Sequence, residues 1–138
     1  MTPTRRSVLC CGIALLGALA GCAGTLPEQD RRIYAATPVA KLSTDVLWKD
    51  YASDAAAADR QYWGKALEVS GNITAISSEP PLAFLTFAEA EQAGVRAELL
   101  DDESAAILEA VKVGDRVTLR CFCEGLDGTV RLKSCIRQ

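Results

Sequence analysis

Hydrophobic and polar side chains alternate with a period of two in several parts of the chain, which is the pattern of a half-buried β-strand. The clearest run covers residues 65–75, and shorter or weaker runs cover residues 82–87 and 95–99. Residues 117–136 contain two further alternating runs that are joined by a Gly-Leu-Asp-Gly turn, and this pattern predicts a hairpin. The chain is therefore expected to be mainly β.

Two segments have the hydrophobic spacing of helices instead. The first begins at Ser43, which can cap a helix, and extends to about Ala58. The second begins at Asp101 and Asp102, whose charges suit the positive end of a helix, and extends to about Val111. The predicted order is helix, three strands, helix and two strands. We therefore predict a five-stranded OB-fold barrel preceded by an N-terminal helix, with a short helix between strands three and four.

Residues 1–21 have the pattern of an export signal. Arginines at positions 5 and 6 precede an apolar stretch, which leads into Leu-Ala-Gly-Cys at residues 19–22. This ending resembles a bacterial lipobox, in which small residues precede a cysteine that receives the lipid. We therefore predict a lipoprotein signal peptide over residues 1–21 and lipidation of Cys22. A membrane-spanning anchor is the alternative, but it needs about 20 apolar residues, and the stretch here is shorter.

Lipidation would place the protein in the cell envelope, attached to a membrane by the lipid at Cys22. Ala23, which follows the cysteine where an aspartate would signal retention, favours the outer membrane facing the periplasm, by resemblance to Gram-negative lipoproteins. The paired arginines fit general secretory and twin-arginine export alike. Residues 22–42 have neither helical nor strand periodicity and predict a flexible tether. The OB-fold domain is then expected over residues 43–138.

The composition narrows the chemistry that this domain can perform. The chain has no histidine, which excludes Ser-His-Asp and Cys-His catalytic pairs and histidine-ligated zinc. Without residues 1–21 the chain has 13 basic and 18 acidic side chains, a net charge near -5, which counts against nucleic acid as a partner. Three cysteines follow Cys22, fewer than the four ligands of a structural zinc site. We expect no catalytic residue, metal or cofactor.

One face of the predicted hairpin carries cations beside an aromatic residue. These candidate ligand residues are Arg120, Phe122, Arg131 and Lys133. An aromatic ring among cations can stack on bases and neutralise phosphates on an OB-fold. A solvated strand face, on which cations discourage edge association, produces the same pattern. Both interpretations remain open at this point.

Two sequence signatures frame the predicted barrel. The first is Asp54-x-x-x-Ala58-Asp59-x-x-Tyr62-x-Gly64-Lys65-x-Leu67-x-Val69-x-Gly71-x-Ile73. The second is Gly114-Asp115-x-Val117-x-Leu119-x-x-x-Cys123-x-Gly125, followed by Val130-x-Leu132-x-x-Cys135-Ile136. Together they resemble the tRNA-anti-like OB-fold family, small bacterial proteins that are commonly exported or lipid-anchored. The resemblance covers residues 43–137 and implies a fold more firmly than a ligand.

The same resemblance bears on the cysteines. Cys123 and Cys135 match the paired positions of the family, and an exported protein lies in an oxidising compartment, so the resemblance implies a Cys123–Cys135 disulfide. If the turn lies between Leu126 and Asp127, strict alternation places these two side chains on opposite faces, so the bond would need a bulge. The alternative is a Cys121–Cys135 pair.

These observations predict an exported, lipid-anchored OB-fold module that binds or interacts within the envelope and has no catalytic activity. Its partner would be an unidentified envelope protein or a small ligand. The alternative is an oligonucleotide or a small anionic ligand bound by the basic face of the C-terminal hairpin. The sequence does not identify the ligand.

Overall fold

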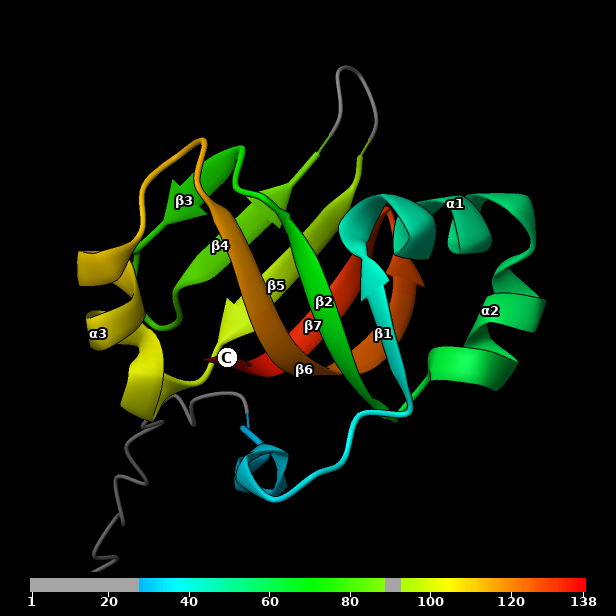
Figure 1. Ribbon diagram of the computed structural model, residues 1–138, viewed down its shortest axis with the longest axis horizontal. Helices are drawn as coiled ribbons and strands as arrows, with labels where there is room; N and C mark the ends of the chain where they lie inside the picture. The colour runs from blue at the N-terminus through cyan, green and yellow to red at the C-terminus, as the bar shows by residue number, and fades with distance from the viewer. Residues whose placement is uncertain (1–27, 89–92) are drawn as a thin grey trace, which may run out of the picture.

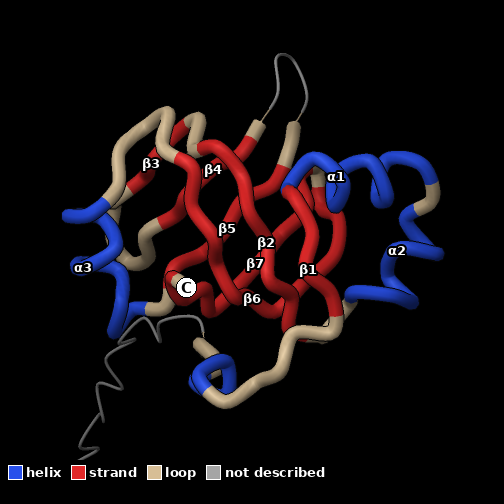
Figure 2. Tube along the Cα trace, in the orientation of Figure 1, coloured by secondary structure: helices blue, strands red, loops and turns tan. Residues whose placement is uncertain are grey.

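The computed structural model describes residues 28–88 and 93–138, so the predicted signal peptide and Cys22 lie outside it. The elements in chain order are the 3-10 helix η1 (Arg31–Tyr34), β1 (Ala40–Ser43), α1 (Thr44–Ser53), α2 (Ala55–Tyr62), β2 (Ala66–Asn72), β3 (Ala75–Ser77), β4 (Phe84–Phe87), β5 (Val95–Leu99), α3 (Asp101–Ala110), β6 (Arg116–Asp127) and β7 (Thr129–Arg137). The strands form one curved sheet, with α1 and α2 at one end and α3 at the other (Figures 1 and 2).

The strand order in the sheet is β1-β2-β6-β7-β5-β4-β3. β1 is parallel to β2 and β5 is parallel to β7, whereas the other neighbouring pairs are antiparallel. Only Ile73 and Thr74 separate β2 from β3 in the chain. The amide of Ile73 donates to the Asp115 carbonyl at 2.9 Å, and the amide of Thr74 donates to the Thr86 carbonyl at 2.8 Å. This bend therefore joins two distant positions of the sheet, which curls around the core.

The expectation of a mainly β fold with flanking helices is confirmed, but the predicted five-stranded barrel differs in detail. The sheet is open and has seven strands among the described residues, because β1 adds a parallel strand and the predicted first strand divides into β2 and β3. The helix predicted between the third and fourth strands is α3, which lies between β5 and β6. Pairings between distant segments produce these differences, and alternation within one segment does not reveal them.

The predicted N-terminal helix consists of two helices. Ser43 caps α1, because its hydroxyl accepts a hydrogen bond from the Val46 amide at 3.2 Å. Asp54 has an extended backbone that ends α1, and its carboxylate accepts from the Ala57 amide at 3.0 Å to cap α2. One aspartate therefore ends the first helix and begins the second.

The flexible tether predicted over residues 22–42 is wrong for residues 28–42, which pack on the sheet. Ile33 in η1 is fully buried. Its apolar neighbours in this cluster are Ala66, Leu100 and Ile136. The amide of Asp30 donates to the Ser134 hydroxyl at 2.8 Å, and β1 follows as a paired strand. A segment that buries one large side chain shows no hydrophobic period, and residues 22–27 lie outside the described part of the chain.

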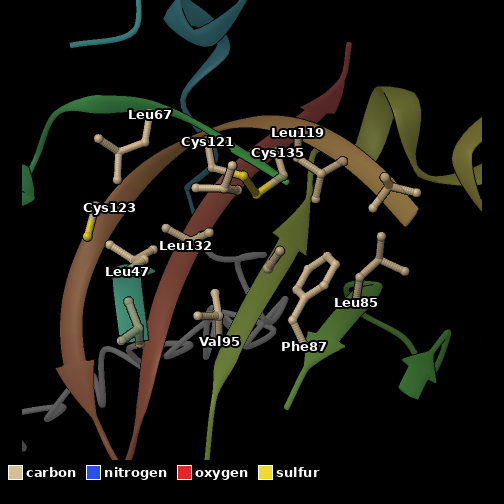
Figure 3. Packing of buried hydrophobic residues seen from close by; sticks show 14 of the residues in the cluster. Leu47, Leu67, Leu85, Phe87, Val95, Leu119, Cys121, Cys123, Leu132 and Cys135 are labelled. Atoms are coloured by element: carbon tan, nitrogen blue, oxygen red, sulfur yellow. A yellow bond between two sulfur atoms is a disulfide. The ribbon is translucent and has the colours of Figure 1, made fainter. Parts of the chain in front are cut away.

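The hairpin of β6 and β7 contains two bulges. Ser134 and Cys135 lie opposite the single residue Cys121, and Glu124 is an extra residue on β6. Ser134 has a φ of 53°, which is uncommon for a residue other than glycine and is consistent with a bulge. The first bulge brings Cys135 beside Cys121, and a disulfide joins them in the core (Figure 3).

The predicted Cys123–Cys135 disulfide is therefore wrong, and the alternative pair is the one that forms. The turn of the hairpin lies at Gly128, and Leu126 pairs with Val130, so the register differs from the one assumed in the prediction. Cys123 is a buried free thiol that points into the core apart from the disulfide (Figure 3).

Candidate functional site

The N-terminal segment covers part of the predicted ligand face. Phe122 packs against the cluster around Ile33. Arg120 donates to the carbonyl oxygens of Ile33 and Tyr34, both at 3.4 Å, and to Oε1 of Gln138 at 2.7 Å. Its Nε is buried without a hydrogen-bond partner among the described residues. We call Arg120, Phe122 and the η1 residues above them the covered half of the face, because these two side chains hold the chain's own N-terminal segment.

Arg131 and Lys133 lie closer to the hairpin end, where solvent reaches them. Arg131 forms an ion pair with Asp127 at 3.5 Å, and Lys133 forms one with Glu124 at 3.3 Å. Lys133 is the cross-strand partner of Phe122, so it lies where the covered half ends. Arg131 and Lys133 line a groove that the sequence analysis did not predict, and we call this groove the open half.

The groove lies between the loop at residues 78–83 and the end of the β6–β7 hairpin. It consists of two adjoining hollows of about 400 Å³ and about 190 Å³. Its aromatic and charged lining residues are Glu28, Glu79, Phe84, Arg96, Glu98, Glu124, Asp127, Arg131 and Lys133. In OB-folds, ligands bind on the second and third strands and the loops beside them. β4 and β5 are the corresponding strands here, so the groove is the candidate site.

Phe84 and Arg96 form the central feature of the groove. The guanidinium carbon of Arg96 lies 3.8 Å from the centroid of the Phe84 ring, which is a cation–π contact. Within residues 28–88 and 93–138, no hydrogen bond or ion pair engages the Arg96 side chain. Arg131 is the cross-strand partner of Arg96 in the β5–β7 ladder. The groove thus contains two arginines from neighbouring strands, one of them over an aromatic ring.

Carboxylates flank these cations. Glu98 accepts a hydrogen bond from the Gln29 side chain at 3.1 Å, and Gln29 also donates to the Leu99 carbonyl at 2.9 Å. Glu124 and Asp127 form the ion pairs with Lys133 and Arg131. Five acidic residues line the groove against three basic residues. The electrostatic character of the groove is therefore mixed, with cations at the centre and acids around them.

A second polar cluster, between α1, α2 and β6, lacks the properties of a catalytic site. The Tyr51 hydroxyl donates to Asp59 Oδ1 at 2.9 Å and lies 3.3 Å from the Cys123 sulfur. Burial raises the pKa of the Cys123 thiol, so the thiol is protonated near neutral pH and is a poor nucleophile. Burial raises the pKa of Tyr51 as well, and that of Tyr62 to about 12. These groups form a structural network.

The sequence analysis missed most of the groove, including the three strand residues Phe84, Arg96 and Glu98. All three occupy polar or partly exposed positions of alternating strands, a signal that the sequence carries. Their proximity depends on the β4–β5 pairing, in which Phe84 lies opposite Glu98. Of the four predicted ligand residues, the structure places Arg131 and Lys133 in the groove and Arg120 and Phe122 under η1.

Metal-binding clusters and membrane-spanning helices are both absent from residues 28–88 and 93–138. This part of the chain holds no group of three or more metal-ligating side chains. It also holds no helix with the length and apolar character needed to cross a membrane.

Comparison with known proteins bears on the family and the fold. No curated protein matches the chain significantly. A lipoprotein of Klebsiella pneumoniae, for which nucleic-acid binding has been suggested, is similar in structure, with a TM-score of 0.59 at 16% identity over 81% of this chain and 99% of that chain. OBody AM3L09, bound to hen egg-white lysozyme, gives a TM-score of 0.44 at 12% identity over 81% of this chain and 96% of its own. The sequence profile of the tRNA_anti-like family matches residues 7–136, and the chain belongs to this family.

Proposed function

We propose that this protein is a lipid-anchored, non-catalytic binding module of the cell envelope, and that the groove of the open half is its binding surface. The family membership supports an OB-like fold, and the lipobox-like sequence at residues 19–22 supports the anchor. The similar Klebsiella protein is also a lipoprotein. The anchor is then the lipid at Cys22, and the protein lies at the outer membrane, facing the periplasm.

The stack of Arg96 on Phe84 is the observation that best supports the groove as the binding surface. A stacked guanidinium that has no acceptor among the described residues is ready to bind a ligand, since the aromatic ring has already restricted its rotamers. The stack lies on the strands that OB-folds use for recognition. Catalysis is not proposed, because the charged groups of the groove that have close contacts are held in ion pairs, Lys133 with Glu124 and Arg131 with Asp127, or in the stack of Arg96 on Phe84.

Site-specific photo-crosslinking in cells tests the binding surface. A photoreactive amino acid at position 77, on the rim of the groove, is expected to capture a ligand, whereas one at the exposed position 61 of α2 is not. Arg96→Ala in the same chain should abolish the capture from position 77. Equal capture from both positions, or capture that survives Arg96→Ala, would contradict the groove as the binding surface.

The anchor is tested separately. Cys22→Ser is expected to move the protein from the membrane fraction to the soluble fraction and to block cleavage after residue 21. Mass spectrometry of the native protein should find an acylated cysteine at the N-terminus. An unprocessed N-terminus would exclude the lipoprotein part of the proposal and leave the groove unaffected.

An oligonucleotide is the second candidate ligand. The Klebsiella neighbour favours it by the binding suggested for that protein, and the cations beside Phe84 are of the type that contacts phosphates and bases. Binding to single-stranded DNA would then weaken steeply as salt rises, because released counterions drive such binding.

A further inference from the structure

Two arginines occupy paired positions on the outer surface of the sheet. Arg96 and Arg131 are directly paired in the parallel β5–β7 ladder, so both side chains project from the same face. Like charges at such positions repel each other. Arg131 has one carboxylate near it, that of Asp127 at 3.5 Å, and this carboxylate is 83% exposed. Within the described residues this is the one ion pair that either arginine forms, so their remaining N–H groups can bind an added oxyanion.

The stack on Phe84 determines how Arg96 can bind such an oxyanion. The guanidinium carbon of Arg96 lies 3.8 Å from the centroid of the Phe84 ring, and all N–H groups of a guanidinium lie in its own plane. This geometry suits two parallel hydrogen bonds to a carboxylate or a phosphate. A lysine at the same position would keep the charge and lose the planar pair of donors.

The surrounding acids distinguish between these two oxyanions. The carboxylates that line the groove are those of Glu28, Glu79, Glu98, Glu124 and Asp127. A nucleic acid brings one phosphate per nucleotide, so a bound strand would bring phosphates close to these carboxylates. Proteins that bind single strands use positively charged grooves instead. A polypeptide can bring one carboxylate together with cationic side chains and amides, which match both the central cations and the flanking acids.

We infer that the groove binds a polypeptide segment that places one carboxylate against Arg96 and Arg131 and basic side chains against the flanking acids. This inference rests on the proposed binding function of the groove and names its ligand class. The carboxylate belongs to an aspartate, a glutamate or the C-terminus of the partner.

An array of short synthetic peptides tests this ligand class with the full-length protein purified in detergent. The array contains acidic, basic, mixed-charge and uncharged dodecapeptides, each with a free or an amidated C-terminus, and an oligothymidylate of the same length is tested in parallel. Mixed-charge peptides that carry a carboxylate are expected to bind, and the oligothymidylate is not. Tighter binding of the oligothymidylate would overturn the inference in favour of a nucleic acid.

Arg96→Lys and Arg96→Ala locate the binding. Both variants are expected to weaken the best mixed-charge peptide by about tenfold or more, which is the scale of one lost charge-assisted hydrogen bond. Arg96→Lys keeps the charge, so its loss of binding separates planar recognition from simple attraction. Arg60→Ala removes an exposed arginine of α2 outside the groove and should leave binding unchanged. Equal weakening by Arg60→Ala, or full binding by Arg96→Lys, would overturn the inference.

Failure of this inference and failure of the proposed function give different results. If position 77 captures a ligand in cells and no peptide binds on the array, the groove is a binding surface for another class of ligand. If position 77 captures nothing, the proposed function itself fails.

Discussion

The covered and open halves of the sheet surface contain similar chemistry and use it differently. Each half has an arginine and a phenylalanine on neighbouring positions of the sheet. In the covered half, two backbone carbonyls and a carboxamide accept hydrogen bonds from Arg120, and Phe122 packs beside Ile33. In the open half, Arg96 stacks on Phe84 and has no acceptor among the described residues. Residue type alone therefore does not distinguish a structural arginine from a candidate ligand-binding arginine.

The difference depends on where the N-terminal segment lies. Side-chain contacts attach this segment to the body: Gln29 to the amide of Asp101 at 2.7 Å, Arg31 to Asp102 at 2.8 Å, and Tyr34 to Glu103 at 2.7 Å. The first of these contacts supplies a cap to α3, whose own N-cap Leu100 has no side-chain hydrogen bond. The described part of this segment contacts Arg120 and forms no hydrogen bond or ion pair with Arg96.

Ile33→Ala should have the largest effect on this arrangement. Ile33 is fully buried, so its truncation leaves a cavity and is expected to lower the free energy of unfolding by about 3 kcal/mol. Urea denaturation measures this change. Val46→Ala, at a position that is 47% exposed, serves as the matched control and should cost less than about 1 kcal/mol. Equal losses in the two variants would mean that the covering segment contributes no packing.

The double variant Cys121→Ala with Cys135→Ala should be the next most destabilising. The disulfide closes a loop with a sequence separation of 14, for which the loss of chain-entropy stabilisation is about 3 kcal/mol or somewhat less. Hydrogen exchange should increase more at the Asp30 amide than in β4, because that amide bonds to Ser134 in the bulge beside the disulfide, whereas β4 pairs with β3 and β5. Cys123→Ala leaves the disulfide intact and should lower the free energy of unfolding much less. An equal loss in Cys123→Ala and in the double variant would show that the disulfide is not the stabilising feature.

A pair of arginine variants compares the two halves directly. Arg120→Met removes the hydrogen bonds to the covering segment and should cost about 1–2 kcal/mol in the free energy of unfolding. Arg96→Met keeps an apolar contact with Phe84 and should change it by about 0.5 kcal/mol or less. Thermal or urea unfolding of the two variants gives this comparison. If Arg96→Met proves the more destabilising, Arg96 has a structural role and the contrast between the halves fails.

The sequence was sufficient for most of the regular elements of this fold. Residues 66–72, 84–87, 95–99 and the hairpin were all predicted as strands, because their side chains alternate between core and solvent. The covering segment was not predicted, since Ile33 alone enters the core there and one buried side chain produces no periodicity. The family resemblance implied the wrong disulfide partner, and the bulge at Ser134 that brings Cys135 beside Cys121 depends on tertiary pairing, which the sequence does not show.

Only part of the candidate site could be predicted from the sequence. Arg131 and Lys133 stood out because they lie on the strongly patterned hairpin. Arg96 lies on the weakest of the predicted strands, and it meets Phe84 through the β4–β5 ladder. A site assembled from separate strands requires knowledge of their pairing, which the sequence of each strand does not contain.

The smallest expected effect is an acid-induced loosening of the covered half. Arg32 donates from Nε to Asp30 Oδ1 at 2.9 Å and holds the pKa of Asp30 at about 2, below its ordinary value of 3.8. Arg31 likewise lowers the pKa of Asp102. Because the folded state has the lower pKa, this stabilisation is complete above about pH 4 and is lost as the pH falls toward about 2.

Exposure of these pairs to solvent keeps the effect small and sensitive to salt. An NMR titration of the Asp30 carboxyl group measures its pKa, and hydrogen exchange in residues 29–34 reports the loosening in the same pH range. Asp30→Asn should remove most of this pH dependence from the segment, while exchange in β5, on the open half, should stay unchanged. A titration midpoint at the ordinary value of 3.8 would show that Arg32 does not hold Asp30 in solution, and the attachment of the covering segment would then rest on Ile33 and Ser134.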